Sequence, residues 1–198
     1  MRTQFEISNW ALRHLGMKKI GSLAGTDPAA IACNDFFNPS RDDVFREFQW
    51  PFATVQQPLE QSGVTVPLGW TFTYTHPVNN VATVWSVFNL ATQLTKDAQN
   101  FQIYYIPESN TKIIASNLES AYAEITYIVE DPLIWDAKFD MAMSYRLASA
   151  MAVALTGDAS KATALAQVYY SLIAEAKRVS SNEKIRKPPQ QSGYQSAR

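Results

Sequence analysis

The chain has 198 residues, 46% of them hydrophobic and 12% aromatic, which suits one ordinary globular domain or a small domain with a large insertion. The net charge of −1 supplies no overall field that would select nucleic acid or an anionic membrane, and the single cysteine excludes a disulfide within the chain. The chain has no long apolar run, no apolar leader and too few cysteines and histidines for a usual zinc site, so we expect no membrane span, no secretion signal, no metal and no cofactor.

The first segment predicts a short helix. Thr3 and Glu6 have the spacing of a capping box, in which each side chain satisfies a backbone N–H at the helix start. Gly16 suits the left-handed residue that ends a helix. The apolar stripe between them has helical spacing and consists of Ile7, Trp10, Ala11, His14 and Leu15.

A second helix is predicted from Asp27, because a capping carboxylate followed by proline is a strong start signal. Pro39 lacks an N–H and its ring clashes with the preceding turn, so we expect it to interrupt this helix. Ser40 would then restart the helix, which would end before Pro51. Cys33 falls among the apolar positions and is interpreted as a small buried hydrophobe.

Residues 51–130 change in character, with few charges and many threonines, valines and aromatic residues. Strands are predicted at 70–76, 81–88 and 101–106, at 112–116 as a hairpin partner, and at 121–129. Short strands separated by turn signals favour an antiparallel sheet or a small sandwich.

After Pro132 the apolar spacing is helical again. Phe139, Met143, Leu147, Met151 and Ala154 form one stripe, and Leu165, Tyr169, Leu172, Ala176 and Val179 form another. Gly157 ends the first of these helices and Asp158 caps the second. The short link between them predicts an antiparallel helical hairpin.

Residues 184–198 contain four basic residues, two prolines and no acidic residue. So few apolar residues cannot offset backbone ordering at about 1–2 kcal/mol per residue, so we expect a flexible C-terminal tail. The predicted fold class is therefore α+β. Residues 1–50 and 131–183 would form one discontinuous antiparallel helical bundle, and residues 51–130 an inserted antiparallel β domain.

Several segments together resemble the tail tubular protein A family of podovirus head-to-tail adaptors. The resemblance begins with Ile7, Asn9, Ala11, Leu12, Leu15 and Gly16 and continues through the run from Arg41 to Ala53. It extends over Gly69, Trp70, Tyr74 and Pro77, and it closes with Leu147, Ala148, the run Leu155–Asp158, Ala174, Ala176 and Glu183. The chain departs from the family pattern after Pro77, where an acidic residue and a cysteine are usual.

The resemblance implies a structural protein and not an enzyme. Such adaptors form a ring, twelvefold in this family, between the portal and the tail nozzle of a short-tailed bacteriophage. DNA passes through the ring without sequence-specific binding. We therefore expect a virion neck protein that assembles in the host cytoplasm. Its portal-binding residues would lie in the tail: Lys184, Ile185, Arg186, Lys187, Pro188, Pro189 and Tyr194.

Other interpretations stay open at this point. The tail could be a solvated terminus without a function, because chain ends fray. A tail-associated cell-wall or polysaccharide hydrolase is the alternative function. Its carboxylate pair would come from Glu108, Glu119, Glu124 and Glu130, but a sequence cannot show their separation. Trp10, Trp50 and Trp70 are interpreted as core anchors and not as a sugar platform, and His14 as a satisfied core or interface histidine.

Overall fold

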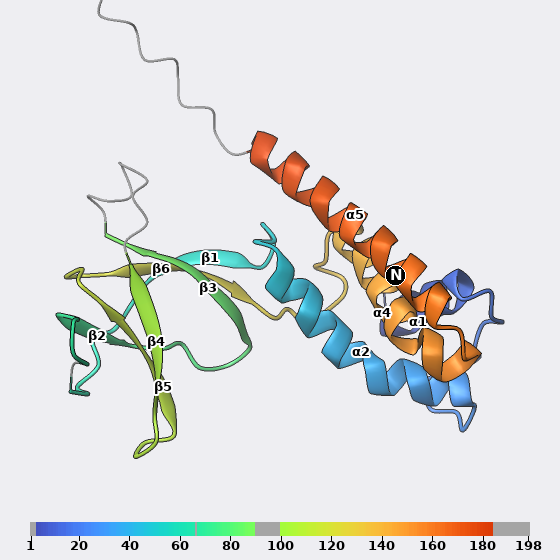
Figure 1. The fold of residues 1–198 in the computed structure, drawn as a ribbon, viewed down its shortest axis with the longest axis horizontal. Coiled ribbons are helices and arrows are strands. Elements are labelled where there is room, and N and C mark those ends of the chain that lie inside the picture. Colours follow the sequence, from blue (N-terminus) through green and yellow to red (C-terminus); the bar gives the residue numbers. More distant parts are fainter. Residues whose placement is uncertain (1–2, 66, 90–99, 184–198) are drawn as a thin grey trace, which may run out of the picture.

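The computed structural model describes residues 3–65, 67–89 and 100–183, and it describes side chains as far as Val179. Helices gather at one end of the molecule and strands at the other (Figure 1). The class is therefore mixed α+β, as predicted. The described elements are α1 (Gln4–His14), α2 (Pro28–Glu47), β1 (Thr54–Pro58), β2 (Phe72–Thr75), β3 (Val81–Phe88), β4 (Phe101–Ile106), β5 (Thr111–Ser116), β6 (Tyr122–Tyr127), α4 (Ala137–Thr156) and α5 (Ala159–Glu183).

The ends of α1 follow the predicted caps. The Thr3 side chain accepts a hydrogen bond from the Glu6 amide at 3.2 Å. At the other end Gly16 has a φ of +74°, in the left-handed region, and the Met17 amide donates to the Leu12 carbonyl. This six-residue loop is the Schellman motif, which satisfies carbonyls that the helix leaves open.

The helix α2 corrects one prediction, because it runs through Pro39 without a break. An interior proline costs about 3 kcal/mol or more in a helix. Buried apolar side chains lie on both sides of it, Cys33 and Phe37 before and Val44 and Phe45 after. Burying each large apolar side chain contributes about 1.5–3 kcal/mol, so packing of both halves outweighs the local cost.

The helices α4 and α5 form the predicted hairpin. Asp136 caps α4 by accepting from the amides of Lys138 and Phe139, and Gly157 ends it at a φ of +68°. Asp158 then accepts from the amides at the start of α5. The predicted stripes need two changes: Ala154 is exposed, and Ile173 is more deeply buried than Leu172.

We call the four helices the helical body, because α1 and α2 share one core with α4 and α5. Its centre is a group of aromatic rings around Phe139. The Phe139 ring lies 4.5 Å from that of Phe45, 4.7 Å from that of Trp135 and 5.0 Å from that of Trp50, measured between centroids. Segments from the two ends of the described chain therefore fold together.

The six strands, which we call the β lobe, form two three-stranded antiparallel sheets of order β1-β6-β3 and β2-β5-β4. They share one core, in which Tyr74 and Ile114 of one sheet meet Val87, Ala123 and Ile125 of the other. The predicted hairpin is confirmed, since β4 pairs with β5 from Phe101 opposite Ser116 to Ile106 opposite Thr111.

One prediction in the β lobe is wrong. Trp70 is half-buried and does not anchor the core, because β2 begins only at Phe72 and Trp70 ends a turn that starts at Pro67. Its indole N–H donates to the Tyr104 hydroxyl at 3.0 Å. Trp50, by contrast, is 2% exposed and does belong to the core of the helical body.

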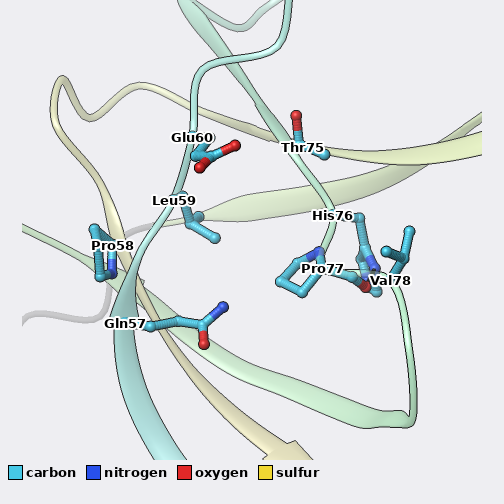
Figure 2. Close-up of a pocket in the computed structure, with 8 residues that line it drawn as sticks. All are labelled: Gln57, Pro58, Leu59, Glu60, Thr75, His76, Pro77 and Val78. Atoms are coloured by element: carbon cyan, nitrogen blue, oxygen red, sulfur yellow. Dashed lines mark hydrogen bonds between the residues drawn. The ribbon is translucent and has the colours of Figure 1, made fainter.

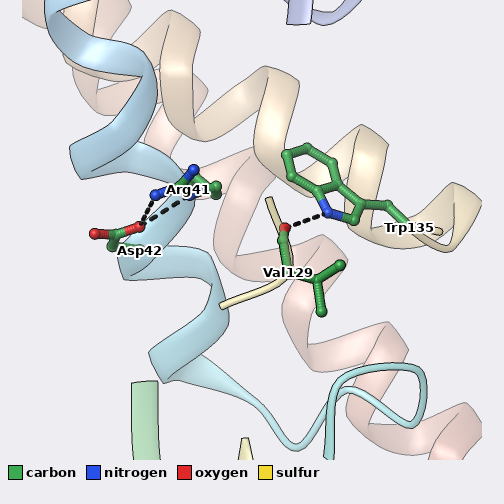
Figure 3. A network of polar contacts seen from close by, with 4 residues as sticks. All are labelled: Arg41, Asp42, Val129 and Trp135. Atoms are coloured by element: carbon green, nitrogen blue, oxygen red, sulfur yellow. Dashed lines mark hydrogen bonds and ion pairs between the residues drawn. The ribbon is translucent and has the colours of Figure 1, made fainter. Parts of the chain in front are cut away.

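The β lobe joins the helical body at two crossings of the chain. On the way out, the Gln49 amide donates to the Glu124 carboxylate of β6 at 3.1 Å. On the way back, the Trp135 indole donates to the Val129 carbonyl at 2.7 Å, beside α2 with its Arg41–Asp42 ion pair (Figure 3). Trp135 is 1% exposed, so this bond ties the end of the lobe to the core of the body.

Candidate functional site

The predicted portal-binding residues of the tail, 184–198, lie outside the described residues. The structure does describe the helix that leads to them. Figure 1 shows the C-terminal end of α5 projecting beyond α4, away from the rest of the helical body. The tail therefore starts at a projecting end of the molecule.

Two pockets of the helical body have Met141 as a common lining residue. The first pocket has a volume of about 230 Å³ and lies between α1 and α4. The second, of about 250 Å³, lies between α4 and α5. We call this surface the body groove and define it by Trp10, Arg13, His14, Ala137, Lys138, Met141, Leu172 and Glu175.

His14 is the most constrained side chain of the body groove. Its ring stacks on Tyr145 with centroids 3.9 Å apart, and its Nε2 lies 3.1 Å from the Ser144 hydroxyl oxygen. The Ser144 hydroxyl donates its one proton to the Met141 carbonyl, so His14 Nε2 must carry the hydrogen of this contact. Burial lowers the pKa of His14, which favours the neutral ring.

The rim of the body groove carries both signs of charge. Arg13 is exposed at the end of α1, and Lys138 lies 3.6 Å from Glu175 across α4 and α5. Among the described lining residues, Met141 and Leu172 are large apolar side chains. Apolar side chains together with polar groups of both charges are the chemistry of a protein contact.

A separate pocket lies on the β lobe, where the chain leaves β1 and where it leaves β2 (Figure 2). It has a volume of about 250 Å³ and is lined by Gln57, Pro58, Leu59, Glu60, Thr75, His76, Pro77 and Val78. His76 Nδ1 lies 2.7 Å from the Pro77 carbonyl oxygen, and burial lowers its pKa. Glu60 is the one carboxylate among these lining residues.

The four glutamates considered for hydrolysis lie on different elements. Glu108 is exposed in the turn between β4 and β5, and Glu119 and Glu130 are exposed on either side of β6. Glu124 lies on β6, where its carboxylate accepts from Gln49 and from the Ser86 hydroxyl. None of the four lines the pocket of Figure 2, so the hydrolase alternative stays a prediction without a described cleft.

Sequence reasoning identified His14 and Trp10 as one helical face but missed the body groove. The groove combines residues of α1 with residues of α4 and α5, which follow α1 by more than a hundred positions in the chain. Met141 lies outside the predicted apolar stripe of its helix, and its exposure follows from the packing of the helices, so the stripe pattern does not reveal the groove.

None of the described helices has the length and apolarity needed to cross a membrane. No group of three or more metal-ligating side chains comes together among the described residues. No protein-family model matches the chain, and no curated protein matches it either.

Proposed function

We propose that this chain is a structural head-to-tail adaptor of a short-tailed bacteriophage. Copies would assemble into a ring below the portal protein. The ring would be twelvefold by analogy with the adaptor family that the chain resembles. The lower side of the ring would receive the tail nozzle, and DNA would pass through its channel during ejection. The protein would act in the neck of the virion after assembly in the host cytoplasm.

The observation that carries the proposal is the arrangement of the chain. Its two outer parts form one helical body, the middle part forms a separate β lobe, and the C-terminal end of α5 projects beyond α4. This is the organisation that the sequence pattern predicts. The sequence motifs of the resembling family also fall on structural landmarks, such as the helix end at Gly157 and the buried Trp50.

The surface of the described residues supports an assembly role. Large apolar side chains are exposed on both parts of the molecule, among them Leu68 and Val78 on the β lobe, Leu133 and Ile134 shortly before α4, and Met141 in the body groove. Exposed apolar side chains that gather beside a groove mark contact surfaces in soluble proteins. A ring subunit needs such surfaces on two sides, because each copy meets two neighbours.

The charge of the chain also fits a DNA channel. The affinity of a protein for DNA grows with each phosphate that it neutralises, so a strongly basic lumen would retain the DNA. A net charge of −1 avoids that retention. The tail has four basic residues and no acidic one, so it is the part with a positive net charge, and its Lys184, Arg186 and Lys187 would pair with acidic groups of the portal.

The tail suits a partner that binds several tails at once. A segment that orders on binding loses part of its interaction energy to that ordering. Copies held in one ring act together through effective concentration, so each tail need bind only weakly. Ile185, Pro188, Pro189 and Tyr194 would supply the apolar contacts.

Truncation tests this role of the tail. A chain ending at Glu183 should keep its helical circular dichroism, because α5 packs on α4 through residues as far as Ala176. We expect it to bind purified portal rings at least about tenfold more weakly in sedimentation, a loss of about 1.4 kcal/mol per site. As the matched control, Arg198→Gln alone should change binding little. Binding of the truncated chain at full strength would remove the tail from the proposal.

A further inference from the structure

The two sheets of the β lobe do not form a closed barrel among the described strands, so edge strands remain. Past Pro58 the chain continues along the outer edge of β2, where the Thr75 amide donates to the Glu60 carbonyl and the Ser62 amide donates to the Thr73 carbonyl, both at 2.8 Å. The strands therefore follow one another as β3, β6, β1, β2, β5 and β4. In this order β3 and β4 are the two ends, and no described strand pairs with the outer edge of β4.

An open edge exposes unpaired backbone N–H and C=O groups, and proteins normally protect it. The strand β1 is short and ends in Pro58, β2 is covered by residues 60–62, and β3 has two register shifts. Each of these is a known way to prevent pairing with another chain. The strand β4, Phe101–Ile106, has six residues in unbroken register and contains no charged residue, proline or glycine.

The side chains of β4 add to this exposure. Ile103 lies opposite Ile114 in the β4–β5 pairing, so it is on the face of the sheet that faces the lobe core. Tyr105 is on the same face, because side chains alternate along a strand. Although Ile114 is fully buried, Ile103 is 40% exposed and Tyr105 is 58% exposed. Apolar side chains of the core face therefore continue past the place where the opposing sheet covers them.

We propose that β4 pairs with β4 of a second copy of this chain, antiparallel and centred on Tyr104. This register places Ile103 of each copy opposite Tyr105 of the other, on the same face. An aromatic side chain opposite a β-branched one is a favourable cross-strand pair. Because β4 has no charged residue, no like charges meet. The sheet then continues as β2-β5-β4 from one copy into β4-β5-β2 of the other.

The occupant is a second copy because the strand complements itself. A two-fold contact uses the same patch on both partners, which requires each side chain to suit its symmetry mate. The register about Tyr104 fulfils this condition for both exposed apolar residues at once. The contact does not depend on the proposed function. Contacts within a closed ring are head-to-tail, so a two-fold contact through β4 would be additional to them.

Sedimentation of the full chain over a concentration series tests the pairing. Wild type should form a dimer, and either Ile103→Lys or Tyr105→Lys should raise its dissociation constant on the order of tenfold or more, because lysine on an edge opposes pairing. Val153→Lys is the matched control, since Val153 is 54% exposed but lies on α4. A wild type that stays monomeric at all concentrations, or a dimer that persists in both β4 variants, overturns the proposal.

A disulfide tests the register and does not depend on the lysine variants folding. In an antiparallel pair the two central Cα atoms lie about 4.5–5.5 Å apart, within the range that a disulfide bridges. Tyr104→Cys should therefore cross-link quickly on mild oxidation. The native Cys33 is fully buried and does not compete. Val153→Cys reports random collision, and a cross-linking rate for Tyr104→Cys no greater than that of this control also overturns the proposal.

Discussion

At the scale of single residues, His14 shows how one ring can join two helices. It stacks on Tyr145 and donates to Ser144, both on α4, while belonging to α1 itself. These contacts hold the ring in a half-buried place that favours its neutral form. The histidine is thus satisfied by its neighbours, as the apolar stripe of the sequence suggested, and it forms one wall of the body groove.

The lowered pKa of His14 predicts an acid sensitivity of the fold. The ring of the unfolded chain takes a proton as the pH falls through about 6.5, whereas the folded ring does so only at lower pH. The unfolded state then binds more protons, so the free energy of unfolding falls as the pH drops below about 7 and is unaffected above it. His14→Gln keeps an N–H donor. Between pH 7.5 and pH 5 its free energy of unfolding, measured by urea denaturation, should decrease less than that of the wild type.

His76 provides the comparison for this experiment. Burial lowers its pKa as well, so it contributes a pH dependence of the same sign. His14→Gln should therefore retain part of the wild-type decrease, and the double variant with His76→Gln should retain less. An identical pH dependence in wild type and His14→Gln would show that His14 has the same pKa in the folded and unfolded chains.

At the scale of elements, Pro39 marks a place where packing overrides local preference. The helix α2 continues through it because Phe37 on one side and Val44 on the other are buried in the same core. Pro39 itself is exposed, so its ring contributes little to that core. The helix therefore keeps the local cost of the proline without gaining a contact from it.

Pro39→Ala should stabilise the protein. Alanine restores a backbone N–H toward the Asp35 carbonyl and removes the ring clash, so we expect the free energy of unfolding to rise by about 1 kcal/mol or more, up to the ~3 kcal/mol of the intrinsic preference. Chemical denaturation measures it. The exposed neighbour Asn38 gives a control, since Asn38→Ala should change stability by about 0.5 kcal/mol at most. A destabilised Pro39→Ala would mean that α2 requires the proline for its packing.

The elements that sequence reasoning found share a local cause. Caps at Thr3, Asp27, Gly157 and Asp158 involve residues a few positions apart, and the strands β3 and β4 are rich in β-branched and aromatic residues. What it missed depends on distant partners. The strand β1 reads TVQQP, without a strong pattern, and becomes a strand through pairing with β6, about seventy residues later. Trp70 looked like a strand residue but ends a turn.

The same distinction applies to the candidate site. The composition of the tail is a local property, so sequence reasoning could name Lys184 and its neighbours as a partner-binding segment, and their role stays a prediction. The body groove requires α1, α4 and α5 to come together, which no local pattern specifies. The open edge of β4 similarly depends on the order of the strands in the sheet, and that order follows from the fold of the whole lobe.

At the scale of the whole molecule, α4 and α5, which follow the β lobe in the chain, pack with α1 and α2, which precede it. Two crossings of the chain join the parts, with Gln49 bound to Glu124 and Trp135 to Val129, and Ala82 of β3 also packs against the helical core. Such an arrangement leaves two different surfaces for different partners. The helical body and α5 would meet the portal, and the β lobe would extend away from it.

Electron microscopy of this chain mixed with purified portal rings tests the adaptor proposal most directly. We expect portal particles to gain a second ring of density, in which one helical body is seated per subunit and a β lobe projects from each. The chain alone and the portal alone are the controls. Portal particles that remain unchanged at saturating concentrations of this chain would contradict the proposed function.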